Sequence, residues 1–149
     1  MIGFFEDAAL RLQALAPALL RVEHAQSDKA MDAFALSHDV TALVHPLSDQ
    51  ALPVNNAGLV VSQSEVWTFG VTMALVFPGG FEQWATARAQ IKTALRGWSW
   101  EDRLATPVEY AGGQTTEYTL GEDGGRWLSV LRFRTSILET YGLLHGQEA

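Results

Sequence analysis

The stretch QSEVWTFGVTMALVF, residues 63–77, decides the fold because its side chains alternate with a period of two. Large apolar residues share one parity, and small or polar residues share the other. This alternation predicts a long β-strand with one buried face. The apolar set comprises Trp67, Phe69, Val71, Met73, Leu75 and Phe77, and the opposite set comprises Ser64, Thr68, Gly70, Thr72 and Ala74. The sequence Pro78-Gly79-Gly80 ends the strand.

Segments with helical spacing lie on both sides of this strand. Apolar residues recur at helical intervals from Phe5 to Leu15, and Pro17 ends that helix. Helical spacing returns from Phe81 to Arg96, with Gly97 at the place of a C-terminal capping glycine. A second short helix is predicted from Ser27 to Phe34 or Leu36.

The remaining segments predict further strands. Leu19–His24 and Val40–Val44 are short candidates, and Val108–Leu120 with Trp127–Leu138 forms a hairpin around GEDGG. The Asp-Gly step in that loop favours a tight turn. The fold class is therefore α+β, a mainly antiparallel sheet with helices packed on one face, and the chain length favours a single domain over residues 1–149.

Composition excludes several classes of function. The formal net charge of −7 argues against DNA binding, because proteins that neutralise DNA phosphates need a basic stripe. The count of 0 cysteines removes disulfides and thiol chemistry and favours a cytosolic protein. Glu6, Asp7 and Arg11 interrupt the apolar N-terminal segment and disfavour a signal peptide, and no apolar run is long enough to span a bilayer.

No catalytic or cofactor motif is recognisable. The four histidines are scattered, and the group Asp28, Asp32, His38 and Asp39 is better explained as solvated residues than as a metal site. Nucleophile elbows, phosphate-binding loops and dinucleotide-binding motifs are absent from the sequence. The pair Gly112-Gly113 is typical of a bulge or of close backbone approach within a strand. We therefore expect no enzyme activity, metal or cofactor.

Three groups of residues are candidates for an interface. Arg132 and Arg134 share the face of their strand opposite to the apolar residues, where they could pair with carboxylates of a neighbouring subunit. Trp98 continues an apolar stripe and belongs to the core, whereas Trp100, before Glu101 and Asp102, is either a semi-exposed interface residue or a lid on the core. The segment Pro46–Gly58, which includes Asp49 and Asn55, reads as a long loop and a candidate contact site.

The sequence as a whole resembles the tail terminator proteins of long-tailed bacteriophages, prophages and gene transfer agents. The resemblance covers roughly Met1 to Leu138 and is most specific in ALRGWSWEDRLATPVEYAGG and GGRWLSVLRFRTSIL, with supporting segments MIGFFEDAALRLQALAPALLRVEHA, VHPLSDQALP and QSEVWTFGVTMALVF. The residues that match its characteristic segment are Gly97, Trp98, Tyr110, Gly112 and Gly113. Ser99–Pro107 departs from the shorter, proline-bearing turn expected there.

This resemblance implies a structural protein of the virion tail, located at the tail–neck junction and assembled in the cytoplasm of the host bacterium. It implies a homo-oligomeric ring, typically a hexamer, that docks on the last ring of the tail tube protein. The ring stops tube polymerisation and offers a surface to neck or head-completion proteins. DNA would pass through the lumen without specific binding, and no enzyme activity, cofactor or membrane is implied.

Two other functions compete with this interpretation. A neck or head-to-tail joining protein would show the same acidic ring character. A small α+β domain could instead bind a ligand in an aromatic pocket, although the tryptophans concerned also fall on buried stripes. These tryptophans are Trp67, Trp84, Trp98 and Trp127.

Overall fold

The computed structural model describes residues 3–24, 40–55, 60–76, 81–102, 106–119 and 125–143. It confirms the α+β class with a mostly antiparallel sheet. The elements in chain order are α1 (Phe4–Leu15), β1 (Arg21–His24), β2 (Thr41–Ala51), β3 (Val60–Val76), α3 (Phe81–Leu95), a 3-10 turn (Trp100–Asp102), β4 (Thr106–Thr119) and β5 (Gly125–Leu143). The predicted helix from Ser27 and the group Asp28, Asp32, His38 and Asp39 lie outside the described residues.

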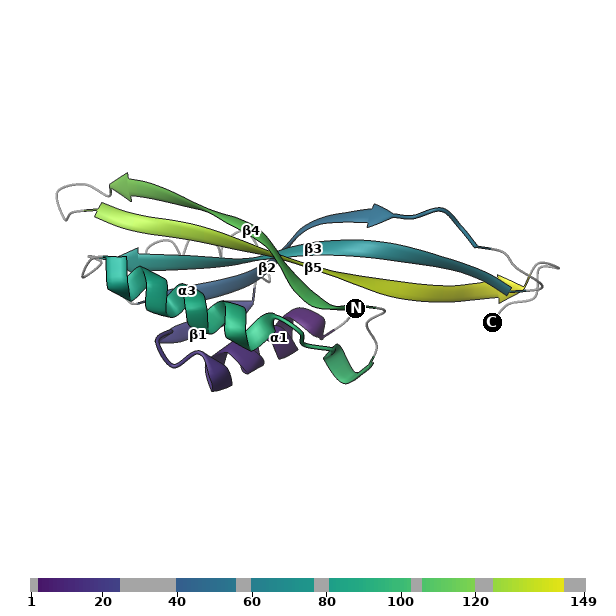
Figure 1. Cartoon of the computed structure of the whole chain (residues 1–149), viewed down its shortest axis with the longest axis horizontal. Coiled ribbons are helices and arrows are strands. Elements are labelled where there is room, and N and C mark those ends of the chain that lie inside the picture. The colour runs from purple at the N-terminus through teal and green to yellow at the C-terminus, as the bar shows by residue number, and fades with distance from the viewer. Residues whose placement is uncertain are drawn as a thin grey trace.

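One sheet with the strand order β1-β2-β3-β5-β4 forms the body of the molecule. β1 pairs with β2 in parallel, and the other three pairings are antiparallel. The long strand predicted from alternation is β3, which lies at the centre and pairs with β5 along its whole length. Figure 1 shows α1 and α3 on one face of the sheet, beneath only one half of its length. Neither helix is long and apolar enough to cross a membrane, and no other helix among the described residues is.

The core lies between the two helices and the odd-numbered face of β3. Phe4 of α1 meets Phe69 edge-on at 5.1 Å between ring centroids and stacks on Trp98 at 5.2 Å. Phe69 in turn stacks on Phe133 of β5. Such aromatic pairs contribute roughly 0.5–1.5 kcal/mol each beyond the area they bury. The odd-numbered face of β3 is buried as predicted, and Trp98 packs against the core as expected. The prediction of only one buried face is wrong at the centre of the sheet, where Thr72 and Ala74 on the opposite face are buried too.

The prediction of a loop at Pro46–Gly58 is wrong in its first part. β2 continues through Pro46 to Ala51, and Asn55 forms an isolated bridge with Ser62 of β3. The register shifts between Pro46 and Ser48, which marks a β-bulge that breaks the alternation seen in the sequence. β1 pairs with β2 only as far as Val44, so Pro46 lies on an edge of the described sheet, where a missing N–H is tolerated.

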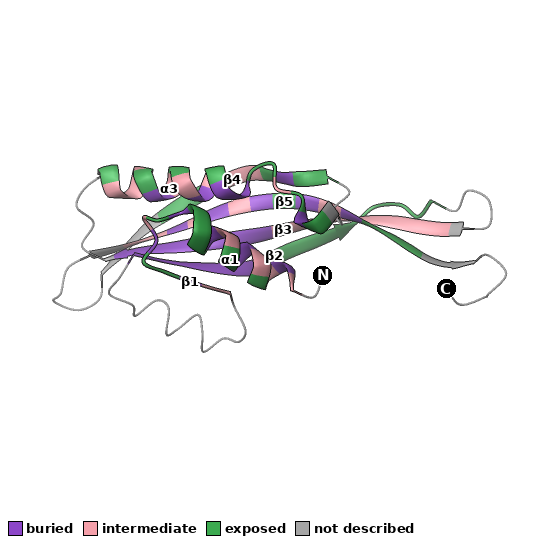
Figure 2. Ribbon diagram, turned by 90° about the horizontal axis from the view of Figure 1, so that it is seen from below, coloured by how far each residue is buried: buried purple, intermediate pink, exposed green. Residues whose placement is uncertain are grey.

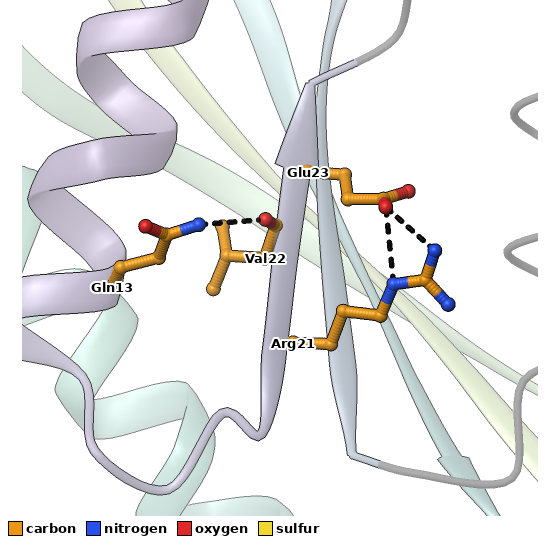
Figure 3. Close-up of polar contacts among 4 residues, drawn as sticks. All are labelled: Gln13, Arg21, Val22 and Glu23. Carbon is orange, nitrogen blue, oxygen red and sulfur yellow. Dashed lines mark hydrogen bonds and ion pairs between the residues drawn. The ribbon is translucent and has the colours of Figure 1, made fainter.

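The short edge strand β1 is protected from further pairing. Gln13 of α1 donates a hydrogen bond from Nε2 to the carbonyl of Val22 at 3.0 Å (Figure 3). Arg21 pairs with Glu23 on the same strand at 2.6 Å, so charge also covers this edge. Side chains that occupy backbone acceptors and carry charge discourage the addition of another strand.

Candidate subunit interface

Three neighbouring strands, β2, β3 and β5, extend past the helices as an arm, which we define as residues 46–55, 60–68 and 135–143. Figure 2 shows this part of the sheet projecting beyond the helix layer toward the end where the chain terminus C is marked. Pairing with β1 stops at Val44, and pairing with β4 begins only at Ser136. Beyond these points the outer edges of β2 and β5 have no neighbour among the described strands, unlike the protected edge at β1.

The arm carries a concentration of exposed apolar side chains. Leu138 is 58% exposed, Val54 48%, Leu47 43% and Leu52 38%. At the base of the arm, a pocket of about 410 Å³ is lined by residues that include Phe5, Leu47 and Trp67. Free strand edges combined with exposed apolar residues are what monomeric proteins normally avoid, because they promote pairing with another chain. The arm is therefore the part of the described surface most suited to contact a partner.

One face of the arm is acidic. Asp49 lies opposite Trp67, and Glu139 lies opposite Gln63, so both share a face with Glu65. Asp49 and Glu139 are exposed, and Glu65 accepts a hydrogen bond from the indole of Trp67 at 3.0 Å. Residues 46–55, 60–68 and 135–143 contain no Lys or Arg. The face is therefore negative and has no internal counter-charge within the arm.

The two arginines predicted for an interface lie elsewhere, on the even-numbered face of β5. Arg134 forms a weak ion pair with Glu109 of β4 at 3.6 Å, with both side chains largely exposed. Arg132 is half-buried, and its neighbours across the strands are Gly70 and Gly112, which leave space on both sides of it. The predicted placement opposite the buried face is confirmed, because Leu131 and Phe133 are buried.

Trp100 is part of the core. Its side chain is 5% exposed, its indole Nε1 donates to Asp7 Oδ2 at 2.7 Å, and its ring meets Phe4 edge-on. The structure thus favours the core-lid alternative over a semi-exposed interface, since the indole leaves almost no surface for a partner. Glu101 on the same 3-10 turn is exposed and has a left-handed backbone, with φ of 46°; Asp102 belongs to that turn.

The remaining motif residues have structural roles. Gly97 has a φ of 80° just after α3, as its predicted capping position requires. Gly112 has a φ of 103° beside a register shift, and a Cβ at Gly113 would lie 2.9 Å from the Tyr110 hydroxyl and 3.0 Å from a backbone carbonyl. The predicted bulge and close backbone approach at Gly112-Gly113 are therefore both present.

A positive stripe on α3 was not singled out from the sequence. Arg88, Lys92 and Arg96 are spaced four residues apart; the first two lie on α3, and Arg96 directly follows its last residue. Arg88 lies 5.4 Å from the centroid of Trp84 and 5.5 Å from that of Tyr110, and Lys92 lies 4.5 Å from the Tyr110 centroid. The spacing of four residues between these basic residues could have revealed the stripe in the sequence. The negative net charge of the chain drew attention away from it.

In the described part of the chain, three of the tryptophans considered for an aromatic pocket lie in different places. Trp67 lines the pocket at the base of the arm, while Trp84 lines a smaller pocket of about 150 Å³ beside Arg88 and Tyr110. Trp98 stacks on Phe4 in the core. No group of three or more potential metal ligands occurs among the described residues.

No protein-family model and no curated protein matches the chain. Among solved structures, the fold is similar to a chain from the virion of a native gene transfer agent particle, with a TM-score of 0.53 over 89% of this chain and 92% of that chain at 16% identity. The fimbrial biogenesis protein PilO from Pseudomonas aeruginosa matches 64% of this chain and 57% of that chain at 12% identity. Its TM-score of 0.25 is too low to carry an argument. The first likeness establishes that this chain shares its fold with a protein found in a virion particle.

Proposed function

We propose that this chain is a structural subunit of a phage-type particle, and specifically a tail terminator. Copies of it form a ring, hexameric by the family resemblance, on the last ring of the tail tube protein at the tail–neck junction. The ring ends polymerisation of the tube and presents a surface to neck or head-completion proteins. The observation that carries this proposal is the nearly end-to-end likeness of fold to a chain from a virion, over 89% and 92% of the two chains.

The arm supports a role in assembly. In a monomeric protein, exposed strand edges and exposed leucines promote aggregation. A subunit of a ring needs two different complementary surfaces, one for each neighbour. The arm supplies one such surface, and the helix layer and the edge strand β4 are available for the other.

The charge of the chain fits passage of DNA through a ring. A net charge of −7 disfavours tight contact with phosphates, which would hold the DNA back during passage. We propose that acidic side chains line part of the lumen. A ring structure with a lumen lined by Lys and Arg would contradict this part of the proposal.

The function is tested by removing the gene and imaging the particles in negative stain. A tail terminator predicts tails that grow beyond their normal length, and expression of the wild-type chain from a plasmid should restore that length. Tails of normal length that are not attached to heads would instead identify a neck or head-to-tail joining protein. Normal, attached tails would contradict both functions.

A further inference from the structure

The positive stripe on α3 has no negative partner among the described residues. Three of the 10 basic residues of an acidic chain lie together at Arg88, Lys92 and Arg96, and none of them forms an ion pair with a described carboxylate. Like charges four residues apart on a helix repel each other and destabilise it. Such a stripe is costly for the isolated subunit, and an external anion would relieve the repulsion.

Two of the three cations of the stripe, Arg88 and Lys92, are held in position by aromatic rings. Arg88 lies over both Trp84 and Tyr110, and its guanidinium donates a long hydrogen bond to the Tyr110 hydroxyl at 3.4 Å. Lys92 lies over the ring of the same tyrosine, with its Nζ 4.5 Å from the centroid. Desolvation lowers the pKa of Lys92, and the neighbouring charges of Arg88 and Arg96 lower it further. The stripe is therefore partly ordered before any partner arrives, which reduces the entropy lost on binding.

The acidic face of the arm is opposite in charge to this stripe, and its carboxylates have a similar spacing. Asp49, Glu65 and Glu139 occupy three successive rows of one face, each on the next strand across the sheet. Rows on one face are about 6.6 Å apart and strands about 4.8 Å apart, which gives a diagonal step of roughly 8 Å. Cations four residues apart on a helix are separated by a rise of about 6 Å. The long side chains of Arg and Lys readily span the difference.

The two surfaces do not meet within one chain. Figure 1 shows α3 beneath the half of the sheet opposite to the arm, with its C-terminal end nearer to the arm than its N-terminal end. The helix-side face of the arm is the same face that α1 and α3 cover elsewhere, but in the arm it lacks a helix layer. A neighbouring copy could supply that layer.

We propose that the acidic face of the arm of one copy docks on the positive stripe of α3 in the next copy. Because the two surfaces differ, the contact is head-to-tail, and its repetition gives a ring when the rotation between neighbouring copies closes. This inference rests on the proposed function and names the contact that joins the subunits. Phosphate groups of DNA are the other anion that could occupy the stripe, but the net charge of −7 opposes them and favours a carboxylate partner.

Cysteine cross-linking tests the contact directly, because the chain has 0 native cysteines. A chain carrying both Arg96→Cys and Glu139→Cys is expressed in the gene-deleted strain, and assembled particles are treated with a short bismaleimide. A head-to-tail contact predicts a ladder of covalent multimers beyond the dimer. Each single-cysteine chain should stop at the dimer or remain monomeric, which makes the two single variants the matched controls.

Charge exchange provides the second measurement, in the same complementation assay. Arg96→Glu should fail to restore tail length, with at least a tenfold loss of terminated tails. It should be rescued when combined with Asp49→Lys, Glu65→Lys or Glu139→Lys in one chain. Arg21→Glu makes the same change of charge on β1, away from the stripe, and should complement normally. Circular dichroism of each purified variant confirms that it is folded.

The outcomes separate this inference from the proposed function. Overlong tails after deletion, a cross-linked ladder and rescue by charge exchange support both. Overlong tails after deletion, but no ladder and normal complementation by Arg96→Glu, would overturn the docking contact and leave the tail terminator role intact. Normal tails after deletion would overturn the function itself. A variant with Arg96→Glu that assembles normally and loses affinity for duplex DNA would assign the stripe to DNA.

Discussion

At the scale of single residues, the contact between Trp100 and Asp7 ties the turn after α3 to the start of α1. Trp100→Phe keeps an aromatic ring against Phe4 but removes the donor that faces the Asp7 carboxylate. Hydrogen bonds to charged groups contribute about 1.5–3 kcal/mol, so we expect a loss of roughly 2 kcal/mol in the free energy of unfolding. Urea denaturation measures it. The double variant with Asp7→Asn should lose little more than the single one, and full additivity would contradict the coupling.

This pair also explains why the sequence left two alternatives open for Trp100. The donor Trp100 and the acceptor Asp7 are separated by 93 positions, so no local sequence pattern could predict this hydrogen bond. Trp98 was easier to predict, because it continues the apolar spacing of α3 and follows a capping glycine. Local periodicity identifies residues that face the core, whereas the partner of a buried polar atom depends on the tertiary fold.

His45 gives the fold a dependence on pH. Its ring lies among Gly70, Leu47 and Thr72, and burial lowers its pKa below the usual 6.5, opposed by a hydrogen bond to the Pro46 carbonyl. The charged residue in the same cross-strand row is Arg132, beyond Gly70. Because the unfolded chain takes up a proton first, stability contributed by neutral His45 is complete above pH 6.5 and falls as the pH drops through the lowered folded value.

The measurement is urea unfolding at pH 7.5 and at pH 5.5 for the wild type and for His45→Gln. We expect the wild type to lose more stability than the variant between the two conditions. The remaining titratable groups are common to both chains and cancel in the comparison. Equal losses in the two chains would contradict the assignment to His45.

At the scale of elements, the arm combines free edges with exposed apolar residues. Leu138→Gln alters a side chain that is 58% exposed, so we expect the free energy of unfolding to change by less than about 0.5 kcal/mol while tail termination is impaired. The matched control is Leu20→Gln, which is 70% exposed and lies outside the arm. Thermal melting and tail length in the complementation assay are the two readouts. Equal impairment by both variants would contradict a specific role of the arm in tail termination.

The elements themselves were predictable where the pattern was regular. β3 alternates over its whole buried part, and the hairpin of β4 and β5 was visible from its turn and its apolar parity. The second half of β2 was not, because Pro46 and the bulge after it interrupt the alternation just where β1 stops covering the strand. The arm could not be foreseen from the sequence, since a strand that extends past its helices has the same local pattern as one that lies beneath them.

At the scale of the whole molecule, the chain carries two unlike surfaces. The arm presents carboxylates and exposed leucines, and the flank of α3 presents cations ordered by aromatic rings. Among the described residues, no ion pair within the chain joins either surface to residues of opposite charge. A heterologous pair of surfaces on one subunit gives a closed ring when its rotation closes, and an open filament when it does not.

The most direct test of this account is the native mass of the purified chain, measured over a range of concentrations and again after addition of isolated tail tubes. The account predicts a single closed assembly whose mass is an integral multiple of the 16.3 kDa subunit, a hexamer by the family resemblance, and which binds at tube ends. A species of 16.3 kDa at every concentration, with or without tubes, would contradict it.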